Sequence, residues 1–118
     1  MKSDTHNVFA EIVGEQLSAV TFVQDYLQLH FDGPSINAYT PVTVEVEDHA
    51  ARSGEDRFRD ALCRQIGKIV GAAVCDPAQA LRIDFVDGSR IEISLRVADY
   101  AGPEAVAAHG FKRGTIVV

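Results

Sequence analysis

Residues 81–95, LRIDFVDGSRIEISL, alternate apolar and polar side chains on both sides of an Asp-Gly pair. Alternation with a period of two is typical of a strand with one buried face, and Asp-Gly favours a tight turn. A three-residue loop at 86–88, with Gly88 in the left-handed conformation, places apolar pairs on one face and opposite charges on the other. The predicted pairs are Leu81 with Ile93, Ile83 with Ile91, Arg82 with Glu92, and Asp84 with Arg90. A two-residue loop would mix the faces. We therefore interpret these charges as the solvated face of a hairpin rather than as a catalytic cluster.

A second hairpin is predicted at residues 27–39, where the same alternation surrounds DGPS. A four-residue loop at 32–35 would place Phe31 opposite Ile36, Leu29 opposite Ala38, His30 opposite Asn37, and Gln28 opposite Tyr39. The chain continues as a strand at 40–48, TPVTVEVED, with its three valines facing inward. Pro41 lacks an N–H donor, so we expect this strand to lie at a sheet edge there.

Helical spacing appears at residues 55–66, where Phe58, Leu62 and Ile66 fall on one side and Gly67 follows. A strand at 68–75 comes next. A shorter helix is predicted at 8–13, closed by Gly14. Pro103 and Glu104 are typical of a first helical turn, which predicts a helix at 103–109 capped by Gly110. The last residues predict a terminal strand.

The order helix, strand, strand, strand occurs twice, at about 8–48 and 55–98, either as a duplication or as a chance similarity of two antiparallel stretches. The chain of 118 residues has the length of one domain. We therefore expect a single α+β domain over 1–118. It would contain a mainly antiparallel sheet of about six strands, curled toward a barrel, with two or three helices.

The composition, 47% hydrophobic and 24% charged, is ordinary for a globular protein. Neither a membrane-spanning segment nor a signal peptide is evident, so we expect a cytoplasmic protein with reduced cysteines. The net charge is −6, and residues 1–48 hold eight acids and one lysine. This acidic half disfavours nucleic acid and anionic membranes, and it favours a protein partner with a basic surface.

No motif for catalysis is recognisable. The histidines lack the spacing of a metal pair, and no nucleophile elbow or phosphate-binding glycine loop is present. The sequence therefore predicts no catalytic residue, no metal and no cofactor, although it leaves enzymatic activity open.

Two groups of residues remain as candidate binding sites. The first is a polar, mostly uncharged patch on the outer side of the hairpin at 27–39, formed by Gln28, His30, Asn37 and Tyr39. The alternative is that this patch is an ordinary exposed sheet face. Asp99, Tyr100 and Glu104 lie in DYAGPEA (99–105), which would present a docking surface or simply start a helix.

The segments YLQLHFDGPSINAY, IDFVDGSRIEISL and DYAGPEA give the chain a pattern of FDGP, F-x-DGS and SL…DY-x-GPEA over residues 14–106. This pattern resembles a family of small uncharacterised bacterial proteins, some of which resemble immunity proteins of bacterial toxin systems. The resemblance carries no activity to this chain. The acidic half, the small size and the missing catalytic constellation favour a non-enzymatic protein-binding module, which by size and style would be immunity-like. The alternative is a ligand-binding or enzymatic domain that uses Tyr39, His30 or Glu104 in a pocket between the two repeat halves or at a dimer interface. A homodimer with a purely structural role is a third reading.

Overall fold

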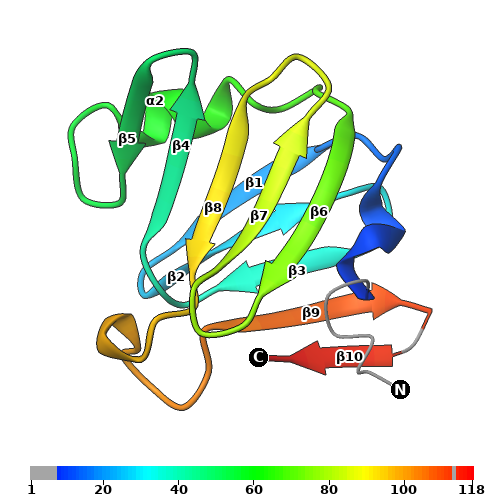
Figure 1. Cartoon of the computed structure of the whole chain (residues 1–118), viewed down its shortest axis with the longest axis vertical. Coiled ribbons are helices and arrows are strands. Elements are labelled where there is room, and N and C mark those ends of the chain that lie inside the picture. The colour runs from blue at the N-terminus through cyan, green and yellow to red at the C-terminus, as the bar shows by residue number, and fades with distance from the viewer. Residues whose placement is uncertain (1–7, 113) are drawn as a thin grey trace.

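The computed structural model describes residues 8–112 and 114–118. This part of the chain forms two five-stranded antiparallel sheets (Figure 1). The first sheet has the order β1-β2-β3-β9-β10, with bounds Ala19–Val23, Tyr26–His30, Ser35–Ala38, Val106–Phe111 and Gly114–Val117. The second sheet has the order β5-β4-β8-β7-β6, with bounds His49–Arg52, Val42–Val46, Arg90–Ser94, Ala80–Phe85 and Val70–Asp76.

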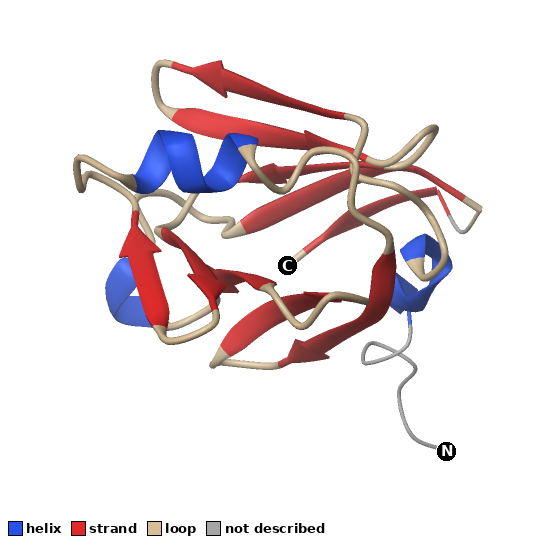
Figure 2. Cartoon of the chain, turned by 90° about the horizontal axis from the view of Figure 1, so that it is seen from above, coloured by secondary structure: helices blue, strands red, loops and turns tan. Residues whose placement is uncertain are grey.

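The two sheets pack face to face around a shared apolar core (Figures 1 and 2). Leu29 and Ile36 of the first sheet and Ile83 and Ile91 of the second are all 0% exposed. Their neighbours along each strand point outward and are mostly half-buried. Since burying one such aliphatic side chain stabilises the fold by about 1.5 to 3 kcal/mol, the alternating pattern is what holds the sheets together.

Short helices close the two ends of this sandwich. The α-helix α2 (Phe58–Cys63) lies between the sheets at one end, and the 3-10 helix η1 (Phe9–Ile12) lies at the opposite end (Figure 2). A further 3-10 helix, η2 (Val97–Asp99), precedes β9. Phe58 and Leu62 are buried as predicted, but Ile66 is 43% exposed because the helix ends at Cys63 and turns Gln65 inward instead. None of the helices in the described ranges has the length and apolar character needed to cross a membrane.

The predicted α+β class is wrong. The described chain is mostly antiparallel β, and its one α-helix has 6 residues. Two separate sheets also replace the expected single sheet of about six strands curled toward a barrel. The antiparallel pairing itself is confirmed.

The helix predicted at 103–109 is the clearest single error, because β9 occupies most of that range. Val106, Ala107 and Ala108 are all buried, so the strand shows no alternation of apolar and polar residues. Gly110 has φ +79, and a Cβ there would lie 2.7 Å from the carbonyl oxygen of Gly33. Glycine is therefore required where β9 passes the β2–β3 turn, rather than at a helix end.

The register of the β7–β8 hairpin is confirmed. Leu81 pairs with Ile93 and Asp84 with Arg90, and Gly88 has φ +95. The β2–β3 register is shifted by two residues from the prediction. Leu29 pairs with Ile36, because the turn consists of Asp32 and Gly33 alone and the Phe31 N–H donates to the Pro34 carbonyl.

The repeated order of elements takes a form that the sequence did not reveal. η1 precedes the meander β1-β2-β3, and α2 precedes the meander β6-β7-β8. The hairpin that follows each meander joins the other sheet: β4 pairs with β8, and β9 pairs with β3. β4 is therefore an interior strand, and the edge predicted at Pro41 is wrong because β5 covers it.

Candidate functional site

The outer face of the first sheet carries no Asp, Glu, Lys or Arg among the residues that the strand registers place there. We call this surface the polar face. Its register-matched residues are Ala19, Thr21, Val23, Tyr26, Gln28, His30, Ser35, Asn37, Ala107, His109 and Val117. Tyr39 joins them through its contacts with Tyr26 and Asn37. In a protein with a net charge of −6, a whole sheet face without a carboxylate or a fixed cation is an unusual concentration of uncharged groups.

Four of the predicted site residues lie together on the polar face. Gln28 is directly opposite Asn37, and His30 is opposite Ser35. Tyr39 follows β3 on the same side. The four residues keep their predicted side because a register shift of two residues preserves the alternation of faces.

A small network of contacts organises this face. The rings of Tyr26 and Tyr39 lie 5.1 Å apart with an interplanar angle of 47°. The Asn37 Nδ2 donates to the Tyr39 hydroxyl at 3.4 Å, and the Thr21 hydroxyl lies 3.1 Å from His30 Nε2. Thr21 was not among the predicted site residues, because β1 has no charge pattern that would reveal its partner strand.

Asn37 is only 7% exposed, and its Oδ1 has no hydrogen-bond partner among the described residues. Turning the amide by 180° would exchange this carbonyl for an amino group in the same position. A buried polar atom without a partner costs about 1 to 3 kcal/mol. The polar face therefore contains a buried amide with one unsatisfied polar atom, which another molecule reaches only if the side chains that cover it move.

A groove of ≈ 400 Å³ borders the polar face and is lined by Asp25, Tyr39 and residues 101–104. We call it the Tyr39 groove. The Tyr39 N–H donates to the Ala105 carbonyl at 2.9 Å and ties the end of the 101–104 loop to the residue after β3. Asp25 and Glu104 make no ion pair with any described residue, so two carboxylates and a tyrosine ring share one concavity. Such a site suits an ammonium or guanidinium group.

The other two predicted residues, Asp99 and Tyr100, lie outside this groove. Asp99 accepts a hydrogen bond from the Ser94 hydroxyl at 2.6 Å and pairs with Arg52 at 3.6 Å. Tyr100 packs against the core. The structure thus joins Glu104 to Tyr39 but gives Asp99 and Tyr100 contacts that support the fold.

The outer face of the second sheet is built differently, and we call it the charged face. Arg90 lies 2.6 Å from Asp84, and Arg82 contacts Asp76 at 3.3 Å and Glu92 at 3.8 Å. The hydrogen bond to Asp84 raises the pKa of Arg90. The charges of this face are therefore largely satisfied by one another.

No group of three His, Cys, Asp or Glu side chains among the described residues is arranged to hold a metal ion. Burial raises the pKa of the Cys75 thiol, and Asp76 adds to this effect, so the reactive thiolate is disfavoured there. Comparison with known proteins finds no matching family model, curated protein or solved structure.

Proposed function

We propose that the protein is a non-enzymatic, immunity-like binding module that engages a partner protein through the polar face. The composition of this face supports the proposal. The buried centres of protein interfaces are enriched in tyrosine and depleted of charged residues, and serine, asparagine and tyrosine supply adaptable contacts in binding surfaces. Tyr26, Tyr39 and Asn37 provide these groups in one place.

In this proposal a lysine or arginine side chain of the partner occupies the Tyr39 groove. Asp25 and Glu104 would pair with its charge, and the face of the Tyr39 ring would contact the cation. The net charge of −6 would also steer a basic surface toward the protein. The observation that carries the proposal is the double role of Tyr39, which belongs to the uncharged face and to the acidic groove.

Site-specific photo-crosslinking tests this assignment in cells of the native host. A photoreactive amino acid replaces Gln28 on the polar face in one variant and Thr43 on the charged face in a matched control. We expect one protein to be captured from the Gln28 position and not from the Thr43 position. Equal capture from both positions, or none from Gln28, would contradict the proposal.

The captured protein is then identified, purified and titrated against the wild-type protein and the Tyr39→Ala variant by calorimetry. Sedimentation of the protein alone separates a partner from a second copy of the same chain. Thermal-shift screening with metabolites addresses the alternative function, because a ligand selective for the native state raises the melting temperature.

A further inference from the structure

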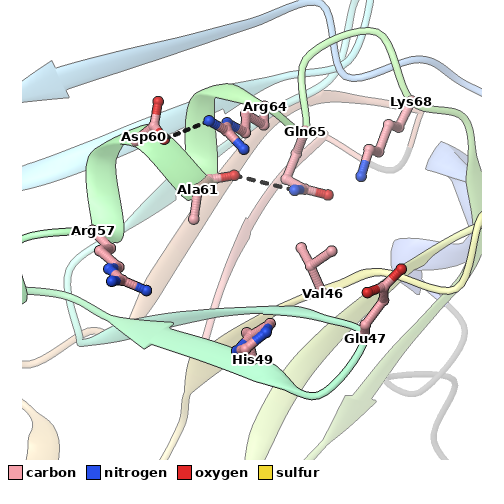
Figure 3. A pocket seen from close by; sticks show the side chains of 9 residues that line it. All are labelled: Val46, Glu47, His49, Arg57, Asp60, Ala61, Arg64, Gln65 and Lys68. Atoms are coloured by element: carbon pink, nitrogen blue, oxygen red, sulfur yellow. Dashed lines mark hydrogen bonds and ion pairs between the residues drawn. The ribbon is translucent and has the colours of Figure 1, made fainter.

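A second site lies away from the polar face, in a cleft of ≈ 470 Å³ between α2 and the β4–β5 hairpin (Figure 3). We call it the α2 cleft. It continues into a hollow of ≈ 250 Å³ that shares Val46, His49, Arg57 and Ala61 with it. Small-molecule sites usually measure about 300 to 1,000 Å³, so the cleft has the size for a metabolite. Its walls come from the two repeat halves, which is where the sequence placed a pocket, but none of the residues predicted for that pocket lines it.

Three of the charged groups in the α2 cleft, Asp60, Arg64 and Lys68, already have ion-pair partners. Arg64 pairs with Asp60 at 3.1 Å. The Lys68 ammonium lies 2.8 Å from the Asp87 carboxylate and 3.1 Å from the Ser89 hydroxyl. These hydrogen bonds hold the pKa of Asp87 well below its usual range, so the pair is ionised at neutral pH.

The wall beside Lys68 is fixed by a buried polar network. Gln65 is fully buried, its Nε2 donates to the Ala61 carbonyl at 3.1 Å, and its Oε1 lies 2.8 Å from the Ser89 hydroxyl. A ligand would therefore meet a side-chain arrangement that is already in place, which lowers the entropy lost on binding.

Arg57 and Glu47 are the remaining charged groups of the cleft, and neither makes an ion pair with a described residue. Figure 3 shows them on opposite sides, with Val46 and His49 between them. We propose that the α2 cleft binds a small zwitterion, with its carboxylate at Arg57, its ammonium at Glu47, and a short apolar body over Val46 and Ala61. This site is independent of the partner surface proposed above.

Titration of the isotope-labelled full chain by NMR tests the proposal with three probes of increasing length: glycine, γ-aminobutyrate and ε-aminocaproate. We expect saturable shifts of the Gln65 side-chain amide and the Arg57 Nε–H, with one length binding best. Caproate and hexylamine, which each carry one of the two charges, should bind about tenfold more weakly than the best zwitterion.

Charge variants make the test specific. Arg57→Glu and Glu47→Arg should each reduce the affinity about tenfold or more, and the double variant should restore it, because the zwitterion can then bind in the reverse direction. Arg59→Gln is the matched control. Arg59 lies in α2, two residues after Arg57, but it stacks over the Phe22 ring at 5.7 Å and does not line the cleft.

Three results would overturn the proposal. The first is the absence of saturable shifts up to about 10 mM probe, a concentration at which even weak millimolar binding is visible. The second is equal binding of caproate, which would make the cleft an anion site. The third is a double variant that folds, as judged by its thermal transition, but binds no better than the single variants.

Discussion

The outer faces of the two sheets differ in whether their polar groups have partners within the protein. On the charged face, Arg90 and Asp84 lie 2.6 Å apart, and most of the charged groups have a partner within the sheet. On the polar face there are no fixed charges, and the buried Asn37 Oδ1 lacks a partner. A face whose groups satisfy one another has little to gain from contact with another molecule. This difference supports the proposal that the polar face, rather than the more heavily charged one, is the surface for recognition.

If the two sheets differ only on their outer sides, their inner sides should contribute similarly to stability. Leu29→Ala in the first sheet and Ile83→Ala in the second should each reduce the free energy of unfolding by about 2 to 5 kcal/mol, because both side chains are fully buried in the shared core. Urea denaturation followed by circular dichroism measures both. A loss below 1 kcal/mol in one variant only would mean that its sheet does not depend on the common core.

Substitutions on the two faces should differ in their effect on the free energy of partner binding. The expected difference is smaller than the losses of stability in the core. Tyr39→Ala should weaken partner binding by about 2 kcal/mol, roughly 30-fold, as expected for an aromatic residue at the centre of an interface. Glu92→Ala on the charged face serves as the control and should change the affinity less than about twofold. Similar losses of affinity in the two variants would contradict the proposed difference between the faces.

Asn37 offers a sharper contrast, because stability and binding should move in opposite directions. Asn37→Leu removes the unpartnered polar atom, so we expect the free protein to become more stable by about 1 kcal/mol. The same change should weaken partner binding. Thermal denaturation and calorimetry give the two values, and a destabilised variant would show that the Asn37 amide is satisfied in the free protein.

The smallest effect is expected on the charged face. Arg90→Ala should destabilise the protein by about 0.2 to 1 kcal/mol, since Arg90 and Asp84 are each partly exposed. A double-mutant cycle with Asp84→Ala isolates the pair, and the coupling should fall when salt is added. A coupling energy that does not change with salt concentration would mean that the pair is less exposed to solvent than its accessible surface indicates.

Local pattern predicted one hairpin more accurately than the other, and the reason is physical. In residues 81–93, a shift of one residue would place charges on the buried face. A shift of two would place like charges opposite each other, Arg82 with Arg90 or Asp84 with Glu92, so the pattern selects one register. In residues 27–39 the outward residues are uncharged, and nothing penalises a shift of two residues. The same absence of charge that made the β2–β3 register ambiguous is what distinguishes the polar face in the structure.

The rest of the fold depends on contacts that no local pattern encodes. The first half of β9 is buried on both sides, so Val106, Ala107 and Ala108 carry no periodic signal, and Pro103 and Gly110 resemble helix caps. The pairing of Ser35 with His109 joins strands at distant positions in the chain. The sequence named Tyr39, His30 or Glu104 as candidates for a pocket, and the long-range pairing of β3 with β9 brings Tyr39 and Glu104 into one groove. The sequence expected a pocket between the two repeat halves, but it named none of the residues that line the α2 cleft.

The exchange of hairpins between the two meanders also governs the order in which the protein can assemble. As the chain leaves the ribosome, β1, β2 and β3 emerge early, yet β3 waits for β9 and the late residues of the chain before its second neighbour exists. β4 and β5 likewise wait for β8. Because neither sheet can be completed until the other half has been synthesised, we expect the nascent chain to acquire its stability late and all at once, and to fold slowly for its size.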